Sequence, residues 1–278
     1  MISMIRIKSV DNKPIHEIVY EYPEGAGRVA TDRFCVFRAA GVGLPPPLQA
    51  VLVMSDIQGR EPSWDRPGKV QRLLGEVIAE DLGVLSDLGD LPPRETIGVL
   101  LAGDLFVVPG LDKRGGGGDV SGIWDVFHDG FRWVAGTAGN HDRFGTGAMD
   151  TQPHFNRPNV HYLDAATVDV DGIRLGGVAG VIGKASKPFR REERDFIAAI
   201  ERVMAQTPDV LVLHEGPSGR SPERPGHDSV REVLERTPQT LVVCGHVHWP
   251  GHDVEELANG TQVVNADAKA FLIEATNE

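Results

Sequence analysis

Cysteine is scarce in this sequence, and its spacing gives no disulfide framework. Cys35 and Cys244 are the two cysteines in 278 residues and lie far apart, a pattern that suits a reducing compartment. No apolar run approaches the roughly 20 residues that a membrane-spanning helix needs. The first ten residues mix Arg6 and Lys8 into a short alternating pattern, which does not fit a signal peptide. We therefore expect a cytoplasmic protein with no membrane partner.

An excess of positive charge is also lacking. The chain carries 28 lysines and arginines against 40 aspartates and glutamates, a formal net charge of -12. An acidic surface repels nucleic acids at long range, so we expect no stable nucleic-acid complex. A small phosphoester substrate remains possible, because bound divalent metal ions would reverse the charge locally. The composition, 41% hydrophobic and 24% charged, is typical of a globular protein, and the length favours one domain over residues 1–278.

Short apolar runs alternate with amphipathic segments along most of the chain. Strands are predicted at 50–54, 97–102, 131–135, 159–163, 209–213, 240–244, 262–265 and 271–274. Helices are predicted at about 69–87, 192–206 and 229–236, where apolar residues recur at helical spacing. Asp171-Gly172 is a typical two-residue hairpin turn. The order strand, helix, strand over residues 50–102 predicts parallel strands and an α/β fold.

Two segments are less regular. Residues 1–48 contain short strand-like runs and a turn-rich stretch, and we expect this extension to add edge strands or a flap to the main sheet. Residues 105–129 are expected to form a long irregular loop, with four consecutive glycines at 115–118. The backbone N–H groups of such a run can cradle phosphate. The spacing of a Walker motif is missing, however, so a flexible loop tip is the favoured interpretation.

Side chains that can bind a metal follow five of the predicted strands directly. They are Asp56 and Gln58, Asp104, Asn140, His214, and His246 with His248. Ligands bind at the carboxyl ends of strands in open α/β sheets, and residues two apart in an extended segment point the same way. The seven side chains are therefore expected to meet at one site.

The chemistry of these side chains indicates a site for two metal ions. Imidazole and oxygen ligands without thiolates suit Mn, Fe, Zn or Ni rather than a structural cysteine site. Seven ligands are too many for one tetrahedral ion and enough for two ions that share a carboxylate. Such ions lie about 3.5–4 Å apart and stabilise the attacking and leaving oxygens of an in-line displacement. A metal-bridging hydroxide then serves as the nucleophile for phosphoester hydrolysis.

The order of these motifs resembles the calcineurin-like metallophosphoesterase superfamily. Asp-x-Gln, Gly-Asp, Gly-Asn-His-Asp, His and Gly-His-x-His follow one another over residues 56–248, and residues 214–248 are similar to the branch with cyclic-nucleotide-phosphodiesterase-like members. The resemblance implies a four-layer α/β/β/α sandwich with two mixed sheets. The implied ligand sets are Asp56, Gln58 and His248 for one metal and Asn140, His214 and His246 for the other, with Asp104 bridging. The resemblance also implies that His141 contacts the phosphoryl group and helps the leaving group to depart.

Two positions depart from the family pattern. Gln58 stands where the family usually has His, and an amide oxygen is a harder and weaker ligand than imidazole. We therefore expect looser metal binding there and a preference for Mn or Mg over Zn, with Mn favoured among Mn, Fe, Zn and Mg. Val107 stands where the family often places an Asp that orients the catalytic His, and Asp142 and Asp112 are candidates to replace it. Loss of such support typically costs about 10–100-fold in activity or affinity.

The leading hypothesis is a dinuclear metal-dependent phosphoester hydrolase that acts on a small phosphodiester or nucleotide. One alternative is a phosphomonoesterase or phosphoprotein phosphatase, and another is a non-catalytic metal-binding scaffold. Arg143 directly follows the Gly-Asn-His-Asp motif and is a candidate for holding a substrate phosphate. It can equally be a solvated surface residue.

Overall fold

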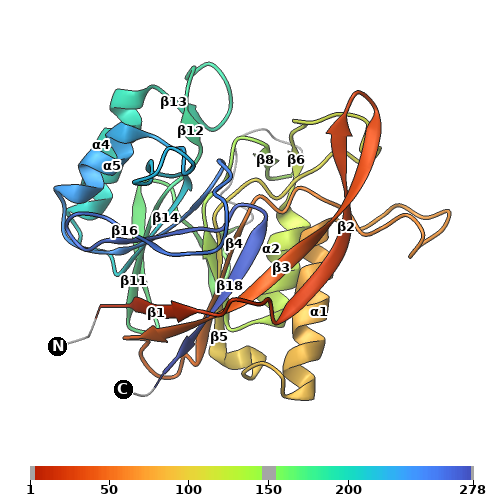
Figure 1. Ribbon diagram of the computed structural model, residues 1–278, viewed down its shortest axis with the longest axis horizontal. Helices are drawn as coiled ribbons and strands as arrows, with labels where there is room; N and C mark the ends of the chain where they lie inside the picture. The colour runs from red at the N-terminus through yellow and green to blue at the C-terminus, as the bar shows by residue number, and fades with distance from the viewer. Residues whose placement is uncertain (1–3, 146–154, 277–278) are drawn as a thin grey trace.

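The computed structural model describes residues 4–145 and 155–276, which form two large β-sheets with helices on their outer sides (Figure 1). The strands of the larger sheet are β1 (Arg6–Val10), β2 (His16–Gly25), β3 (Arg28–Val42), β4 (Ala50–Ser55), β5 (Ile97–Leu101), β7 (Trp133–Gly136), β9 (Val160–Tyr162) and β18 (Lys269–Ala275). Their order is β1-β3-β18-β4-β5-β7-β9, with β2 paired to β3. Strands β4, β5, β7 and β9 run parallel, while β18 pairs antiparallel with β4, so the sheet is mixed.

The second sheet is smaller and also mixed. Its strands are β10 (Ala166–Val170), β11 (Ile173–Val178), β14 (Val210–Glu215), β15 (Leu241–Gly245), β16 (Glu255–Glu256) and β17 (Gln262–Asn265), in the order β10-β11-β14-β15-β17-β16. The four central strands are parallel. Two short strand pairs lie outside both sheets: β6 (Gly118–Asp119) with β8 (Asp142–Arg143), and β12 (Val181–Ile182) with β13 (Arg190–Arg191).

Helices flank the sheets on both sides. They are α1 (Leu74–Leu88), α2 (Ser121–Gly130), α4 (Glu193–Met204) and α5 (Asp228–Glu235), with a 3-10 turn, η1, at Arg94–Thr96. Glu76 stabilises the N-terminus of α1, because its carboxylate accepts a hydrogen bond of 2.7 Å from the backbone N–H of Leu73. Gly89 ends the same helix in the left-handed conformation that favours glycine. Over the described residues, no helix is long and apolar enough to cross a membrane.

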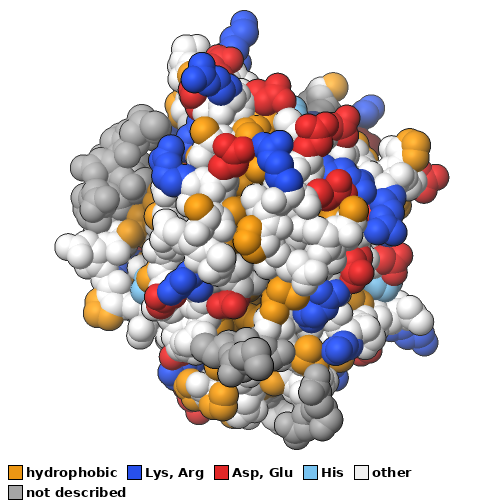
Figure 2. All heavy atoms as spheres, turned by 90° about the vertical axis from the view of Figure 1, so that its left-hand side faces the viewer, with side chains coloured by type: hydrophobic (Ala, Val, Ile, Leu, Met, Phe, Trp, Pro, Cys, Tyr) orange, Lys and Arg blue, Asp and Glu red, His pale blue; other side chains and the backbone are white. Residues whose placement is uncertain are grey.

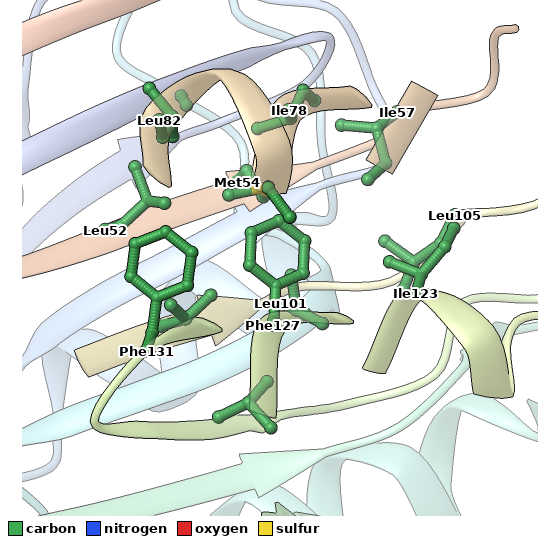
Figure 3. Close-up of a cluster of buried hydrophobic side chains, with 14 of the residues drawn as sticks. Leu52, Met54, Ile57, Ile78, Leu82, Leu101, Leu105, Ile123, Phe127 and Phe131 are labelled. Atoms are coloured by element: carbon green, nitrogen blue, oxygen red, sulfur yellow. The ribbon is translucent and has the colours of Figure 1, made fainter. Parts of the chain in front are cut away.

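Three apolar clusters hold these elements together. One lies between α1, α2 and the larger sheet, where Ile78 and Phe127 meet Met54 (Figure 3). The second lies between the two sheets, and the third packs α4 and α5 against the second sheet. Burying each large apolar side chain stabilises the fold by about 1.5–3 kcal/mol, so the sheets form a firm base for the loops at their carboxyl ends.

The α/β class with two mixed sheets is confirmed, and the predicted parallel connection is seen in β4, α1 and β5. The helix predicted to begin near residue 69 begins at Leu74 instead. Val70, which lies within the predicted helix, precedes the observed one and is 77% exposed. The preceding loop is fixed by other contacts, since the buried Glu61 carboxylate binds Arg72 at 2.8 Å.

The prediction of a long irregular loop at 105–129 is wrong for the second half of this segment, which forms α2. Ile123, Trp124 and Phe127 are buried against the core. Their spacing is that of an amphipathic helix. A glycine at position 122 and the branched and aromatic side chains give this segment low helix propensity, and tertiary packing overrides it.

The first 48 residues contribute β1, β2 and β3 to the larger sheet. The hairpin of β2 and β3 also supports the loop after β4, which carries the predicted ligands Asp56 and Gln58. Glu21 exchanges two backbone hydrogen bonds with Arg60, both 2.9 Å long. The Tyr20 ring lies so close to Gly59 that a Cβ there would be 2.2 Å from the ring. The extension therefore fixes the loop that carries Asp56 and Gln58.

Candidate metal centre

The predicted ligands lie where the parallel strands of the two sheets end. Asp56 directly follows β4, Asp104 lies three residues beyond β5, and His246 directly follows β15. These three residues have φ values of 54°, 53° and 68°. The extended geometry predicted for the Asp56/Gln58 and His246/His248 pairs is therefore wrong, because each pair starts in a left-handed turn. The turns still direct side chains of both pairs into one cavity.

Asp104, His214 and His246 form the tightest group of possible ligands. One ligand atom from each lies within 4.8 Å of the others. His214 Nδ1 donates to the Ala102 carbonyl at 2.8 Å, so its Nε2 is the nitrogen that remains for a metal. Nε2 is buried and lies 3.2 Å from Asp104 Oδ2, so these two atoms face each other across the place where a metal ion would bind.

Asn140 adds an oxygen that the protein leaves unpartnered. Its Oδ1 is buried and makes no hydrogen bond to any described residue. A buried polar atom without a partner is costly in a folded protein and calls for an explanation such as a bound ion. Together with the His214 nitrogen, this orphaned oxygen fits a cation that prefers mixed nitrogen and oxygen ligands.

The other three predicted ligands are more open. Asp56 Oδ2 accepts the Ser55 hydroxyl at 2.7 Å and the His246 N–H at 2.8 Å, which holds the carboxylate and leaves Oδ1 without a hydrogen bond in the described structure. Gln58 lines the same cavity and is half-buried. His248 is 70% exposed, and its ring nitrogen Nδ1 lies 2.9 Å from Asp267 Oδ2.

The charges of this centre conflict strongly when no cation is bound. Burial raises the pKa of Asp56 to about 8, and the negative charges of Asp267 and Asp104 add to the rise while His214 opposes it. Burial is the largest effect on Asp104 and acts to raise its pKa, but the charge and hydrogen bond of His214 together with those of His141 outweigh it and lower this pKa to about 2. Carboxylates crowded in this way are typical of a site built for positive charge.

The imidazoles of His214 and His246 respond in opposite directions. Burial acts to lower the pKa of His214, but Asp104 and Asp56 outweigh it and raise this pKa to about 10. Burial and the neighbouring His214 lower the pKa of His246 to about 4. A metal ion at His214 would therefore displace a proton from its ring.

His141 is held by the glycine run. Its Nδ1 donates to the Gly116 carbonyl at 3.0 Å, and its backbone N–H donates to Asp104 Oδ1 at 2.8 Å. Nε2 lies 3.9 Å from Asp104 Oδ2. The glycine run is thus more than a loop tip, because it supplies the partner of the His141 ring in place of the Asp that is absent at Val107.

Neither of the two carboxylates that were candidates to orient His141 contacts its ring in the described structure. Asp142 is fully buried, and its oxygens accept the backbone N–H groups of Asp104, Leu105 and Gly139, each at 2.8 Å. Its role is to hold the turn that carries Asp104. Asp112 is exposed, and no contact in the described structure links it to His141.

Arg143 lies away from the cavity lining. It donates to the backbone carbonyls of Asn140 and Asp142, and its guanidinium lies over the Phe189 ring, 5.8 Å from the ring centre. This position gives no support to a phosphate-binding role for Arg143, which stays a prediction.

Sequence reasoning missed two residues of the centre. Asp267, the partner of His248, follows β17 in the way that the ligands follow their strands. The strand-end pattern applied once more would have found it. The contact of Gly116 with His141 could not be predicted from residue type, because the backbone carbonyl of Gly116 makes it.

The cavity at the centre has a volume of about 710 Å³. Several predicted site residues line it: Asp56, Gln58, Asp104, His141, His246 and His248. The remaining lining comes from the β2–β3 hairpin, from the loop after β5, and from Asp267 and Ala268.

Comparisons with known proteins bear on the fold and the family of this chain. The protein TT1561 of Thermus thermophilus is similar in structure, with a TM-score of 0.56, 14% sequence identity, and coverage of 80% of this chain and 90% of that one. The phosphopantetheinyl hydrolase PptH of Mycobacterium tuberculosis aligns with a TM-score of 0.46, 17% identity, and coverage of 81% and 89%. No curated protein matches the sequence. The sequence model of the calcineurin-like phosphoesterases, Metallophos, matches residues 50–250. That span covers most of the chain and all seven predicted ligands, and the chain belongs to the calcineurin-like phosphoesterase family.

Proposed function

We propose that this protein is a dinuclear metal-dependent hydrolase of small phosphodiesters or nucleotides. The observation that carries the proposal is the group of Asp104, His214 and His246, whose ligand atoms lie within 4.8 Å of one another. The orphaned Asn140 oxygen supports the same conclusion. This set fits a divalent cation with mixed nitrogen and oxygen ligands.

Each cation would be held by its own set of side chains. One set is Asp104, Asn140, His214 and His246, and the other is Asp56, Gln58, His248 and the shared Asp104. When bound, the two cations supply Lewis-acid stabilisation and the hydroxide that attacks phosphorus at neutral pH. The Ala102 carbonyl fixes the His214 ring and Asp267 fixes the His248 ring, which keeps one nitrogen of each free for a cation.

His141 is proposed as the residue that serves the leaving group. Its Nδ1 proton is engaged by the Gly116 carbonyl, so Nε2 is the atom that can hold and deliver a proton toward the cavity. Its backbone tie to Asp104 keeps it beside the carboxylate proposed to bridge the cations.

The preference for a diester or a nucleotide rests on space. A cavity of about 710 Å³ falls within the ~300–1,000 Å³ of pockets that enclose whole organic ligands. A phosphomonoester bound only through its phosphoryl group would leave most of that volume unused.

The test is hydrolysis by the manganese-loaded protein of bis-p-nitrophenyl phosphate and of p-nitrophenyl phosphate. We expect faster turnover of the diester, and at least about 100-fold loss in Asp104→Asn, since a ligand to both cations is lost. Asp112→Asn is the matched control, because it removes an exposed carboxylate from the same loop. A monoester preference would favour a phosphomonoesterase, whereas full activity of Asp104→Asn would refute the proposed centre.

A further inference from the structure

The cavity continues beyond the proposed ligands to a wall made by two other segments. The β2–β3 hairpin contributes Tyr20, Tyr22, Pro23 and Asp32, and the loop after β5 contributes Phe106, Val107, Arg114, Gly115 and Gly116. The hairpin lies outside residues 50–250, the span that matches the family. We call these two segments together the hairpin wall, and its hairpin half comes from residues outside that span.

Arg114 supplies the permanent positive charge of the hairpin wall. Among the described residues that line the cavity, it is the one lysine or arginine. Its Nε donates to the Pro23 carbonyl at 3.2 Å, which ties the loop to the hairpin. Within the described chain, its two terminal nitrogens have no hydrogen-bond or carboxylate partner, so they are free to bind an anion.

Arg114 also lies beside the residue proposed to serve the leaving group. The next residue, Gly115, is so near His141 that a Cβ there would be 3.4 Å from its Cε1. The one after it, Gly116, accepts the hydrogen bond from the His141 ring. Arg114 and His141 thus line the same cavity, and the glycine run that follows Arg114 contacts the His141 ring.

The hairpin offers an aromatic surface on the other side. Tyr20 and Tyr22 are two residues apart in β2 and so share one face of the strand, with ring centres 5.8 Å apart. Tyr20 is buried against Gly59, while Tyr22 is half-buried and lines the cavity. Tyr22 can therefore cover a planar or apolar group. Asp32 makes the hairpin side unfavourable for an anion, which leaves the loop side for that role.

We propose that the hairpin wall is a leaving-group subsite that binds an organic phosphate. This inference rests on the proposed function and narrows it to substrates whose leaving group carries a second phosphate. Water supplies the new oxygen on the scissile phosphorus, and the bond from that phosphorus to the bridging oxygen breaks. The attacking water gives up one proton to the solvent, and the bridging oxygen leaves on the second phosphate. The negative charge that develops on this oxygen is compensated by the Arg114 guanidinium and by the proton that His141 is proposed to deliver.

The test compares two substrates of the manganese-loaded protein. ADP-ribose releases a phosphate-bearing group whichever phosphorus is attacked, whereas bis-p-nitrophenyl phosphate releases a ring without a phosphate. We expect Arg114→Gln to lower kcat/KM for ADP-ribose by about 10–100-fold, as expected for loss of a charge-assisted contact. The same variant should change turnover of the aryl diester by less than about threefold.

Two further variants complete the test. Lys113→Gln removes the same charge from the neighbouring exposed residue outside the cavity lining and should change neither substrate. Arg114→Lys should recover part of the kcat/KM for ADP-ribose that Arg114→Gln loses. AMP should inhibit the wild type and Arg114→Lys competitively, and should bind Arg114→Gln more weakly.

The outcomes separate the two proposals. If the protein hydrolyses neither substrate nor any other ester, the proposed function and the subsite both fall. If it hydrolyses the aryl diester but not ADP-ribose, the subsite alone falls. The subsite is also overturned if Arg114→Gln affects both substrates equally, or if Lys113→Gln reproduces its effect.

Discussion

Three of the proposed ligands are held in backbone conformations that most residues avoid. Asp56, Asp104 and His246 all have positive φ, which costs about 1–2 kcal/mol for a residue with a Cβ. Glycine or asparagine would occupy such positions at less cost. A carboxylate or an imidazole at these three positions therefore lowers local stability. Such strain is typical of residues whose side chains form a functional site.

Asp56 gives a pH-dependent test of this conflict. Its folded pKa of about 8 lies above the model-peptide value, so its contribution to stability is present at low pH and is lost as the pH rises from about 4 to 8. Asparagine does not titrate. We expect Asp56→Asn, with chelator present, to gain in Tm relative to wild type as the pH rises from 5 to 9. A Tm difference that is constant over this range would contradict the buried-carboxylate account.

Gly116 gives a test of how His141 is oriented. A Cβ at Gly116 would lie 2.2 Å from Val108 Cγ1, so Gly116→Ala should shift the carbonyl that accepts from the His141 ring. We expect kcat to fall about 10–100-fold, as for loss of a partner that orients a functional His. Val108→Ala in the same chain makes room and should restore much of kcat. Gly110→Ala, which meets ordinary contact distances on the same loop, is the control and should leave kcat unchanged.

At the scale of elements, strands buried on both faces were the easiest to predict. The apolar runs that became β4, β5, β14 and β15 are continuous because both faces are covered. The start of α1 and the whole of α2 were harder, since packing decided them over local propensity. The contacts of Gly116 with His141 and of Tyr20 with Gly59 join segments far apart in the chain, and no sequence period encodes such contacts.

The β10–β11 hairpin formed as predicted, with Asp171 and Gly172 both at positive φ. Asp171 also ties this hairpin to β7, because its carboxylate accepts two hydrogen bonds from Arg132, at 2.6 and 2.8 Å, and one from the Trp133 indole at 2.9 Å. The Arg132 hydrogen bond lowers the pKa of Asp171. The two sheets are thus joined at this turn by a charged contact as well as by the apolar cluster between them.

We expect Asp171→Asn to lower the free energy of unfolding by about 1–2 kcal/mol at pH 7, with a discount for partial exposure. Because the folded pKa is depressed, the contribution is present above the unfolded pKa and is lost as the pH falls through the folded value. The gap between wild type and variant should therefore close below about pH 4. Asp169→Asn, which removes an exposed ion pair with Arg174, should have a smaller effect in urea unfolding. Equal effects of the two variants would contradict a special role for the turn.

At the scale of the whole molecule, the surface and the centre carry charge differently. Figure 2 shows lysines and arginines interspersed with acidic residues on one face, without a continuous basic stripe among the side chains it colours. That distribution suits the acidic net charge and a small substrate better than a nucleic acid. The positive charge that attracts a phosphoester would then come from bound cations and from Arg114 inside the cavity.

The proposed cations would also join the two sheets. Asp56, Asp104 and Asn140 follow strands of the larger sheet, whereas His214, His246 and His248 belong to or follow strands of the second. A cation bound by side chains of both sheets stabilises the folded protein only, so manganese should raise Tm as its concentration passes the dissociation constant. At about 100 times that constant the gain is about 2.7 kcal/mol, which corresponds to roughly 5–10 °C for a chain of this size. Asp104→Asn should abolish most of this shift and Asp112→Asn should keep it; a shift that survives Asp104→Asn would place the manganese elsewhere.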